Sequence, residues 1–222
     1  DGQEAIDACR QRKFDVVLCD YDLGPGRNGQ RVLETLRHES LIDNGSLFIL
    51  ISADVSKHAV LAAYDCTPDD YMAKPINTQM LENRISRLVE QRDALLPAMK
   101  ALDEGHRDRA IALLMGVALS RSRAAAQAQK KLGELFLETG EIHKAEKLYQ
   151  KALEVKPLDW ARLGMAYVLQ ARGDLKAAGE SFQQLADDSP MYLPAYDGLA
   201  SNWYMRDNSA KLQLAIANSV KV

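Results

Sequence analysis

The sequence predicts an α/β domain with a parallel sheet, followed by an all-α segment. In the first part of the chain, short apolar runs such as residues 14–19 and 46–52 alternate with stretches of helical periodicity. This alternation is typical of βαβ units, whose strands are parallel. Beyond residue 92 only the helical periodicity continues. We therefore expect two domains, at residues 1–92 and 93–222.

The composition narrows the classes of partner. The chain has 222 residues, of which 47% are hydrophobic and 27% charged, with a formal net charge of −3, so it lacks the basic character of a nucleic-acid-binding domain. No apolar run reaches the ~18 residues of a membrane span. Its cysteines (Cys9, Cys19 and Cys66) lack metal-site spacing, and we interpret them as small core residues. We expect a cytoplasmic protein with no nucleic-acid or membrane partner.

The elements of the first domain follow from local patterns. Apolar residues at helical spacing predict helices over residues 3–12, 29–38 and 57–64, and a final helix that begins near Asn77 or Thr78. Asp1 is a predicted N-cap of the first helix. Strands are predicted at 14–19, 46–52 and 71–75, the first of them buried on both faces. The final helix would bury an apolar face made of Met80, Leu81, Ile85 and Leu88.

Each predicted strand ends in a different polar residue, namely Asp20, Ser52 and Lys74. Parallel neighbours bring their carboxyl ends to one edge of the sheet, where open α/β sheets place their chemistry. A carboxylate nucleophile, a hydroxyl and a compact cation suit phosphoryl transfer, because the last two stabilise charge on the phosphoryl oxygens. Two structural alternatives remain open, an Asp–Lys ion pair at a sheet edge and Asp20 as a cap of the following loop.

Residues 1–92 resemble the receiver domain of response regulators, which has a flavodoxin-like fold. The segments that carry this resemblance are Asp-Gly-Gln-Glu-Ala at 1–5, Asp-Val-Val-Leu-Cys-Asp at 15–20, Ile-Ser-Ala at 51–53 and Asp-Asp-Tyr-Met-Ala-Lys-Pro at 69–75.

The resemblance implies roles for individual residues. Asp20 would accept a phosphoryl group from a histidine kinase or phosphotransfer protein. Ser52 would be the switch hydroxyl, Tyr71 the aromatic switch and Lys74 the phosphate-contacting lysine. Magnesium would be bound by Asp20 and by the backbone carbonyl of Asp22.

One departure from the family lies at the start of the chain. The family's first strand with its acidic pair, its first helix and its second strand do not precede Asp1. Asp20 and one carbonyl are too few ligands for Mg²⁺, and the strand at 14–19 would be an exposed apolar edge. We therefore expect a fragment of a longer protein, one that is phosphorylated poorly or not at all as it stands.

The second part of the chain contains an internal repeat. The residues Gly140, Ala145, Tyr149, Ala152 and Pro157 recur 33 residues later as Gly173, Ala178, Phe182, Leu185 and Pro190. A period of about 34 residues indicates pairs of antiparallel helices. Residues 93–222 resemble tetratricopeptide repeats (TPRs), with about four helix pairs. We also expect the receiver's last helix to run into the first repeat helix, with a kink or break near residues 96–97.

TPR solenoids bind proteins or peptides on a concave face. By the family's pattern, the residues on this face would be Lys130, Glu134, Trp160, Tyr167 and Tyr204. The alternatives are that Trp160 and Tyr167 pack on neighbouring helices, and that Lys130 and Glu134 form a solvated i,i+4 pair worth ~0.3 kcal/mol.

The function predicted is that of a two-component response regulator whose phosphorylation on Asp20 modulates protein–protein contacts of the TPR domain. The chain would not be an enzyme beyond its own phosphoryl transfer, and a homodimer is a further expectation of the resemblance. One alternative is a degenerate receiver that serves as a dimerisation or scaffold module for a TPR adaptor. The other is a phosphatase with an aspartate nucleophile.

Overall fold

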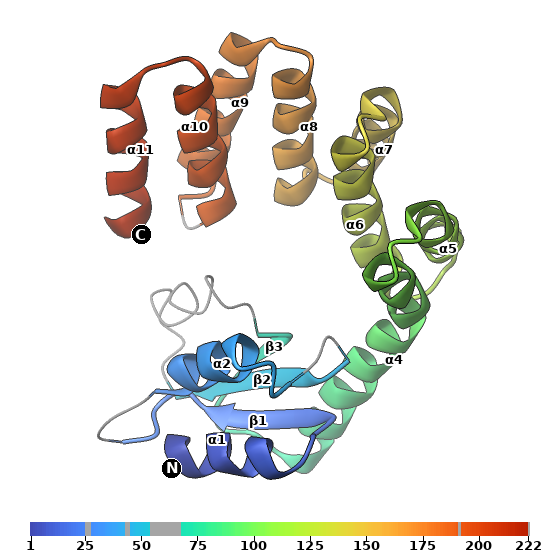
Figure 1. Ribbon diagram of the computed structural model, residues 1–222, viewed down its shortest axis with the longest axis vertical. Coiled ribbons are helices and arrows are strands. Elements are labelled where there is room, and N and C mark those ends of the chain that lie inside the picture. The colour runs from blue at the N-terminus through green and yellow to red at the C-terminus, as the bar shows by residue number, and fades with distance from the viewer. Residues whose placement is uncertain (25–27, 43–44, 54–67, 191, 222) are drawn as a thin grey trace. The chain divides into compact units, whose positions relative to one another are not determined.

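The computed structural model describes residues 1–24, 28–42, 45–53, 68–190 and 192–221 (Figure 1). The chain divides into two compact units, Asp1–Leu96 and Pro97–Val222, where the sequence placed the division at 92/93. This division lies inside one helix, α4 (Thr78–Asp103), which contains Pro97. The predicted helix at 57–64 and Cys66 lie outside the described residues.

The first unit contains a parallel sheet, as predicted. In its described part the strands β1 (Val16–Asp20), β2 (Leu47–Ser52) and β3 (Asp70–Ala73) lie in the order β1-β2-β3. Both neighbouring pairs are parallel, and their register sets Asp20 beside Ile51 and Ser52 beside Ala73. All three strands therefore end at the same edge.

The helices of this unit begin at side-chain caps. Helix α1 (Gly2–Gln11) begins at Asp1, which accepts from the Gln3 and Glu4 N–H groups in a capping box. Helix α2 (Gly29–His38) begins after Asn28, whose side chain accepts from the Arg31 N–H at 2.9 Å. Asn77 accepts from the Met80 N–H at 2.8 Å in the first turn of α4. These side chains satisfy N–H groups that a helix end leaves unpaired.

The sheet has apolar clusters on its two faces, because side chains alternate along a strand. One cluster joins α1 and α2 to Cys19, Phe48 and Leu50. The other joins α4, through Leu88, to Leu47, Ile49 and Met72.

Two predictions of burial in this unit are wrong. Strand β1 is not buried on both faces, because Leu18 is 42% exposed while Cys19 is 5% exposed. Val16 lies on the same face of the strand as Leu18 and packs against the apolar cluster that includes α4. Leu18 lies outside this cluster. Met80 is 47% exposed, so the apolar face of α4 begins at Leu81.

The second unit is built from helices that pack on their neighbours in the chain. Contacts join each helix from α5 to α11 to the next, and they also join α6 to α8 and α8 to α10. Such a series of local contacts is typical of repeat proteins. None of the described helices combines the length and apolar character that a membrane span needs. The helices are α5 (Arg107–Leu119), α6 (Ala125–Glu138), α7 (Ile142–Val155), α8 (Asp159–Ala171), α9 (Leu175–Asp188), α10 (Leu193–Met205) and α11 (Ser209–Lys221).

The same turn ends the helices α4, α6, α8 and α10, and α2 of the first unit also ends in it, at Ser40 with a φ of 54°. Each is followed by a residue of positive φ: Gly105 at 79°, Gly140 at 75°, Gly173 at 84° and Asp207 at 52°. The next residue donates its N–H to a carbonyl five positions earlier, as in the bond from Glu141 to Phe136 at 2.8 Å. This is the Schellman motif, which favours glycine because a left-handed residue with a Cβ is strained. Gly140 and Gly173 are the glycines that recur after 33 residues in the sequence.

The Tyr149 side chain of α7 packs between α6 and α8. Its side chain is 2% exposed, and its ring lies against Gly133 of α6 and Gly164 of α8. A Cβ added at these glycines would lie 2.6 Å and 2.3 Å from ring atoms. Phe182 of α9, which follows Tyr149 by 33 residues, lies in the same way against Gly198 of α10, where a Cβ would be 2.4 Å from its ring. The glycines therefore make room for a large buried ring.

We predict that Gly164→Ala destabilises the helical unit by about 1–3 kcal/mol, because the added methyl overpacks the Tyr149 ring. The matched control is Gly116→Ala in α5, where an added Cβ meets nothing within 4 Å. The control should be neutral or stabilising by about 1 kcal/mol, since alanine favours a helix more than glycine does. Urea unfolding followed by circular dichroism measures the unfolding free energy of both variants. Equal effects would contradict the steric role of the Tyr149 ring.

Candidate functional site

The three polar residues predicted at the strand ends share the carboxyl edge of the sheet. Asp20 is the last residue of β1, Ser52 is the last residue of β2, and Lys74 directly follows β3. Backbone bonds continue at this edge, from the Tyr21 N–H to the Ile51 carbonyl at 2.7 Å and from the Lys74 N–H to the Ser52 carbonyl at 2.8 Å. These bonds set the positions of the three residues along the strand direction relative to one another.

Asp20 and Lys74 are in direct contact. The Lys74 Nζ donates to the Asp20 Oδ2, and the two side chains are 45% and 32% exposed. The other carboxylate oxygen, Oδ1, accepts from the Asp22 N–H at 3.2 Å. Ser52 is 5% exposed. An ion pair this exposed adds only about 0–1 kcal/mol of stability, so stability alone does not account for the arrangement.

Gly29 holds the first turn of α2 close to this edge. Its N–H donates to the Tyr21 carbonyl at 2.9 Å, and a Cβ at this position would lie 2.4 Å from the Asp20 carbonyl oxygen and 2.8 Å from Leu50 Cδ2. Any larger residue would push the helix away from Asp20. The sequence predicts that a helix begins at this residue, but the close approach depends on tertiary packing.

Tyr71 and Cys19 flank the site with groups that are largely inside the protein. Tyr71 pairs with Leu50 in the β2–β3 register and packs against the cluster of α1 and α2. Its buried hydroxyl has no hydrogen-bond partner among the described residues. Burial, with a contribution from Asp20, raises the pKa of the Cys19 thiol to about 11. Cys19 is thus an unreactive core residue, and Cys9 is also buried and free, as expected for both.

The acidic pair before Tyr71 connects β3 to its surroundings. The Asp70 carboxylate, 15% exposed, contacts Arg84 at 2.6 Å and Arg87 at 3.1 Å, both in α4. Asp69 accepts from the Phe48 N–H of β2 at 2.7 Å. Burial raises the pKa of the Asp69 carboxyl, while that N–H and the Arg37 guanidinium act in the opposite direction. In the sequence this pair stands out only as part of a motif, because its contacts with Arg84, Arg87 and Phe48 depend on tertiary packing.

The described residues do not by themselves form a magnesium site. No group of three or more histidine, cysteine, aspartate or glutamate side chains gathers within the described ranges. Asp20 and the Asp22 carbonyl would supply two oxygens, and one Asp20 oxygen is paired with Lys74. Mg²⁺ demands octahedral oxygen coordination, which these two oxygens leave incomplete.

The residues predicted for a groove on the helical unit have varied surroundings. Glu134 pairs with Lys131 at 3.2 Å rather than with the exposed Lys130. Trp160 packs edge-on to Tyr149 with ring centroids 6.1 Å apart, and Tyr167 does so to Phe182 at 5.0 Å. The packing alternative therefore accounts for both of these aromatics. Tyr204 is 75% exposed.

Comparison with known proteins decides the nature of the first unit. Residues 1–86 match the family model described as the response regulator receiver domain. This segment is a receiver domain. The helical residues beyond it lie outside that match.

Three similar proteins are regulators in bacteria. The DNA-binding response regulator MtrA of Mycolicibacterium paratuberculosis is 31% identical over 93 residues, which are 42% of this chain and 39% of that protein. The regulatory protein VanRB of Enterococcus faecalis is 28% identical over 95 residues, 43% of this chain and 41% of that protein. The response regulator protein PmrA of Pseudomonas aeruginosa is 31% identical over 91 residues, 41% and 39% respectively. The chain thus spans about two fifths of the length of these relatives.

We predict that Asp69 makes stability depend on pH. Because its folded-state pKa is raised, the protonated carboxyl favours folding below the unfolded-state pKa of about 3.9. This contribution is lost as the pH rises through the folded-state pKa. Asp69→Asn retains an acceptor for the Phe48 N–H without the titration. The unfolding free energy of the parent minus that of the variant should therefore fall above about pH 4 and then level off. Urea unfolding between pH 4 and 7 tests this, and a rising difference would contradict it.

Proposed function

We propose that the protein is a response regulator in which Asp20 accepts a phosphoryl group from a histidine kinase or phosphotransfer protein. The observation that carries this proposal is the contact between Asp20 and Lys74 at the carboxyl edge of a parallel sheet, within a segment that matches the receiver domain. Ser52 ends the strand that lies between them.

The transfer needs one nucleophile and charge stabilisation. An Asp20 carboxylate oxygen attacks phosphorus, an O–P bond forms, and the N–P bond of phosphohistidine breaks with its electron pair returning to the imidazole. Lys74, which already donates a hydrogen bond to Asp20, would contact the phosphoryl oxygens. The Ser52 hydroxyl would donate a hydrogen bond to them. Such preorganised donors stabilise the charge that spreads over the equatorial oxygens.

The response would begin at Ser52 and Tyr71, which would move toward the phosphoryl group and bias a two-state receiver. Among the described residues the buried Tyr71 hydroxyl has no hydrogen-bond partner, so a new position that supplies one would stabilise this side chain, since an unpaired buried hydroxyl is costly. Arg84 and Arg87 link α4 to Asp70 in β3. Helix α4 continues to Asp103, so a change in β3 reaches the chain segment that follows the receiver.

The output would be protein–protein contact through a TPR-like helical unit, without enzymatic activity beyond the phosphoryl transfer. Two features support the TPR assignment, the turn that recurs at Gly105, Gly140, Gly173 and Asp207 and the buried rings of Tyr149 and Phe182. Receiver-mediated homodimerisation belongs to the same proposal.

A scaffold function is the second candidate, because the described residues offer too few ligands for the Mg²⁺ that receivers generally use. In that case the Asp20–Lys74 contact would be an ion pair of the sheet edge, and the receiver would only pack or dimerise.

We predict that the native protein, incubated with Mg²⁺ and acetyl phosphate, gains one phosphoryl group by intact mass and that Asp20→Asn gains none. Lys74→Met should slow the gain about a hundredfold, the cost of losing one preorganised charge-stabilising group. Asp22→Asn is the matched control, since only its backbone N–H contacts Asp20, and it should be phosphorylated like the parent. Incorporation that persists in Asp20→Asn would refute Asp20 as the acceptor. No incorporation from acetyl phosphate or from a kinase would leave the scaffold function.

A further inference from the structure

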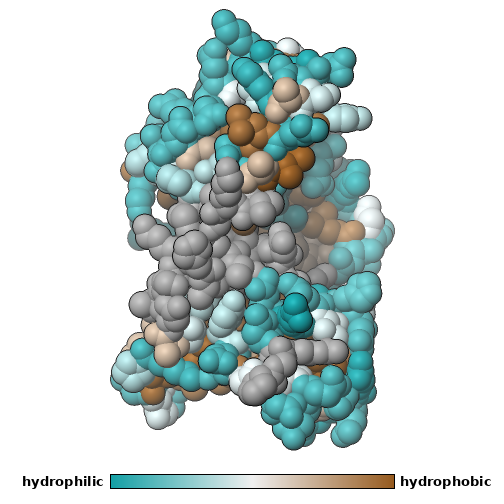
Figure 2. Space-filling view, turned by 90° about the vertical axis from the view of Figure 1, so that its left-hand side faces the viewer, coloured by the Kyte–Doolittle hydropathy of each residue, from teal (hydrophilic) through white to brown (hydrophobic). Residues whose placement is uncertain are grey.

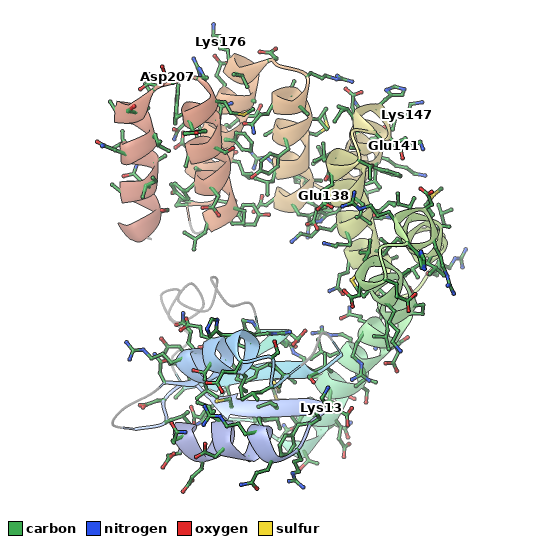
Figure 3. All side chains as sticks on the ribbon, in the orientation of Figure 1. Lys13, Glu138, Glu141, Lys147, Lys176 and Asp207 are labelled. Carbon is green, nitrogen blue, oxygen red and sulfur yellow. The ribbon has the colours of Figure 1, made fainter. Side chains whose placement is uncertain are left out.

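A groove of about 510 Å³ lies on the helical unit between α9, α10 and α11. We call it the α9 groove, and its wall includes Lys176, Gly179, Glu180, Trp203, Arg206 and Lys211. None of these residues belongs to the receiver or to the set that the sequence predicted for partner binding. Figure 3 shows Lys176 and Asp207 at the same end of the helices, where α9 begins and α10 turns into α11.

Two cationic side chains contact the ring of Trp203. The Arg206 Cζ lies 4.4 Å from the ring centroid and the Lys211 Nζ lies 4.3 Å from it. Each contact attracts a cation to the face of the ring, but the two positive charges repel each other. Among the described residues, neither cation forms an ion pair with a carboxylate, and neither does Lys176. The lining of the groove therefore holds three cations that pair with no carboxylate in the described part of the chain, beside the two carboxylates of Glu180 and Asp187.

The floor of the groove is built by close contact of α9 and α10. Asn202 is fully buried and donates to the Leu175 carbonyl at 3.0 Å. Its Oδ1 has no partner among the described residues, and a Cβ at Gly179 would lie 2.7 Å from that oxygen and 3.3 Å from the Arg206 Nη1. Gly179 thus lets α10 approach, and Asn202 holds Trp203 and Arg206 in place along the wall. A wall fixed in this way loses little freedom on binding.

The charges of the groove are unevenly distributed along α9. The carboxylates of Glu180 and Asp187 also line it, and Asp187 accepts from the Gln183 side chain at 2.8 Å. At 1.5 Å per helical residue, Lys176 and Asp187 are about 16 Å apart along α9. Lys176, Arg206 and Lys211 therefore line the end near the α10–α11 turn together with Glu180, and Asp207 also lies at that end, whereas Asp187 lies at the other end.

We propose that the α9 groove binds an acidic peptide segment of a partner protein, with a carboxylate side chain seated at Arg206 and Lys211. A carboxylate there relieves the repulsion of the two cations and forms charge-assisted hydrogen bonds with both. This inference gives the partner of the proposed function a chemical class and rests on that function. It does not depend on phosphoryl transfer, because the groove lies within the helical unit.

The test measures binding of an acetylated, amidated hexaglutamate peptide to the unphosphorylated native protein, with hexaglutamine as the uncharged probe. Six extended residues span about 20 Å, enough to follow the groove. Calorimetry gives the affinity. The chain has two tryptophans, so in a Trp160→Phe background the fluorescence of Trp203 reports whether the peptide sits in the groove. We expect saturable hexaglutamate binding that weakens with salt, a change in Trp203 fluorescence, and no binding of hexaglutamine.

The decisive variant is Arg206→Gln with Lys211→Gln, which should weaken hexaglutamate binding about tenfold or more. Its matched control is Lys147→Gln with Lys151→Gln, which removes the same charge from exposed positions of α7 and should bind like the parent. Equal losses in both variants, or no hexaglutamate binding by the parent, would overturn the proposal. So would self-association of the parent that the Arg206/Lys211 variant abolishes, because it would assign the groove to a second copy. Asp20→Asn should bind the peptide normally, so a failure of phosphorylation and a failure of peptide binding are separate results.

Discussion

The parallel register of three strands is the constraint on which the receiver site depends. Because β1, β2 and β3 are neighbours in chain order and run in one direction, a residue at the end of one strand lies beside the ends of the others. Asp20 and Lys74 are far apart in the sequence, yet they meet there in an ion pair. The pair is exposed and contributes little to stability. Its position therefore depends on the sheet and on the close approach of Gly29 to the Asp20 carbonyl.

In the helical unit, the corresponding constraint is steric. Tyr149 occupies space that only glycine leaves open at positions 133 and 164, and the burial of its ring joins α6, α7 and α8. Burial also raises the pKa of the Tyr149 hydroxyl, as expected for a ring inside the protein. The same principle brings α10 against α9 at Gly179, which places Arg206 on the wall of the α9 groove. Packing that stabilises the array thus also arranges its surface charges.

The surface of the helical unit combines these charges with exposed apolar side chains. Leu214 and Ile216 of α11 are 58% and 50% exposed, and Figure 2 shows apolar patches within an otherwise mostly hydrophilic surface on that side of the unit. Lys211, which contacts the Trp203 ring, precedes them on the same helix. Charged and apolar contacts are therefore available close together on α11, as in many protein interfaces, where a polar rim surrounds an apolar centre.

Local chemistry determined much of this protein from its sequence alone. The strands, their parallel direction, the Asp1 cap, the glycine turns and the edge shared by Asp20, Ser52 and Lys74 follow from patterns between residues close in the chain. Tertiary structure alone decided that Leu18 is exposed, that Glu134 pairs with Lys131, and that Asp69 bonds to the Phe48 N–H. It also decided that Arg206 and Lys211 meet at one tryptophan ring. The physical reason is that periodicity determines which face of an element is apolar, whereas the neighbour that covers a residue depends on how closely elements pack.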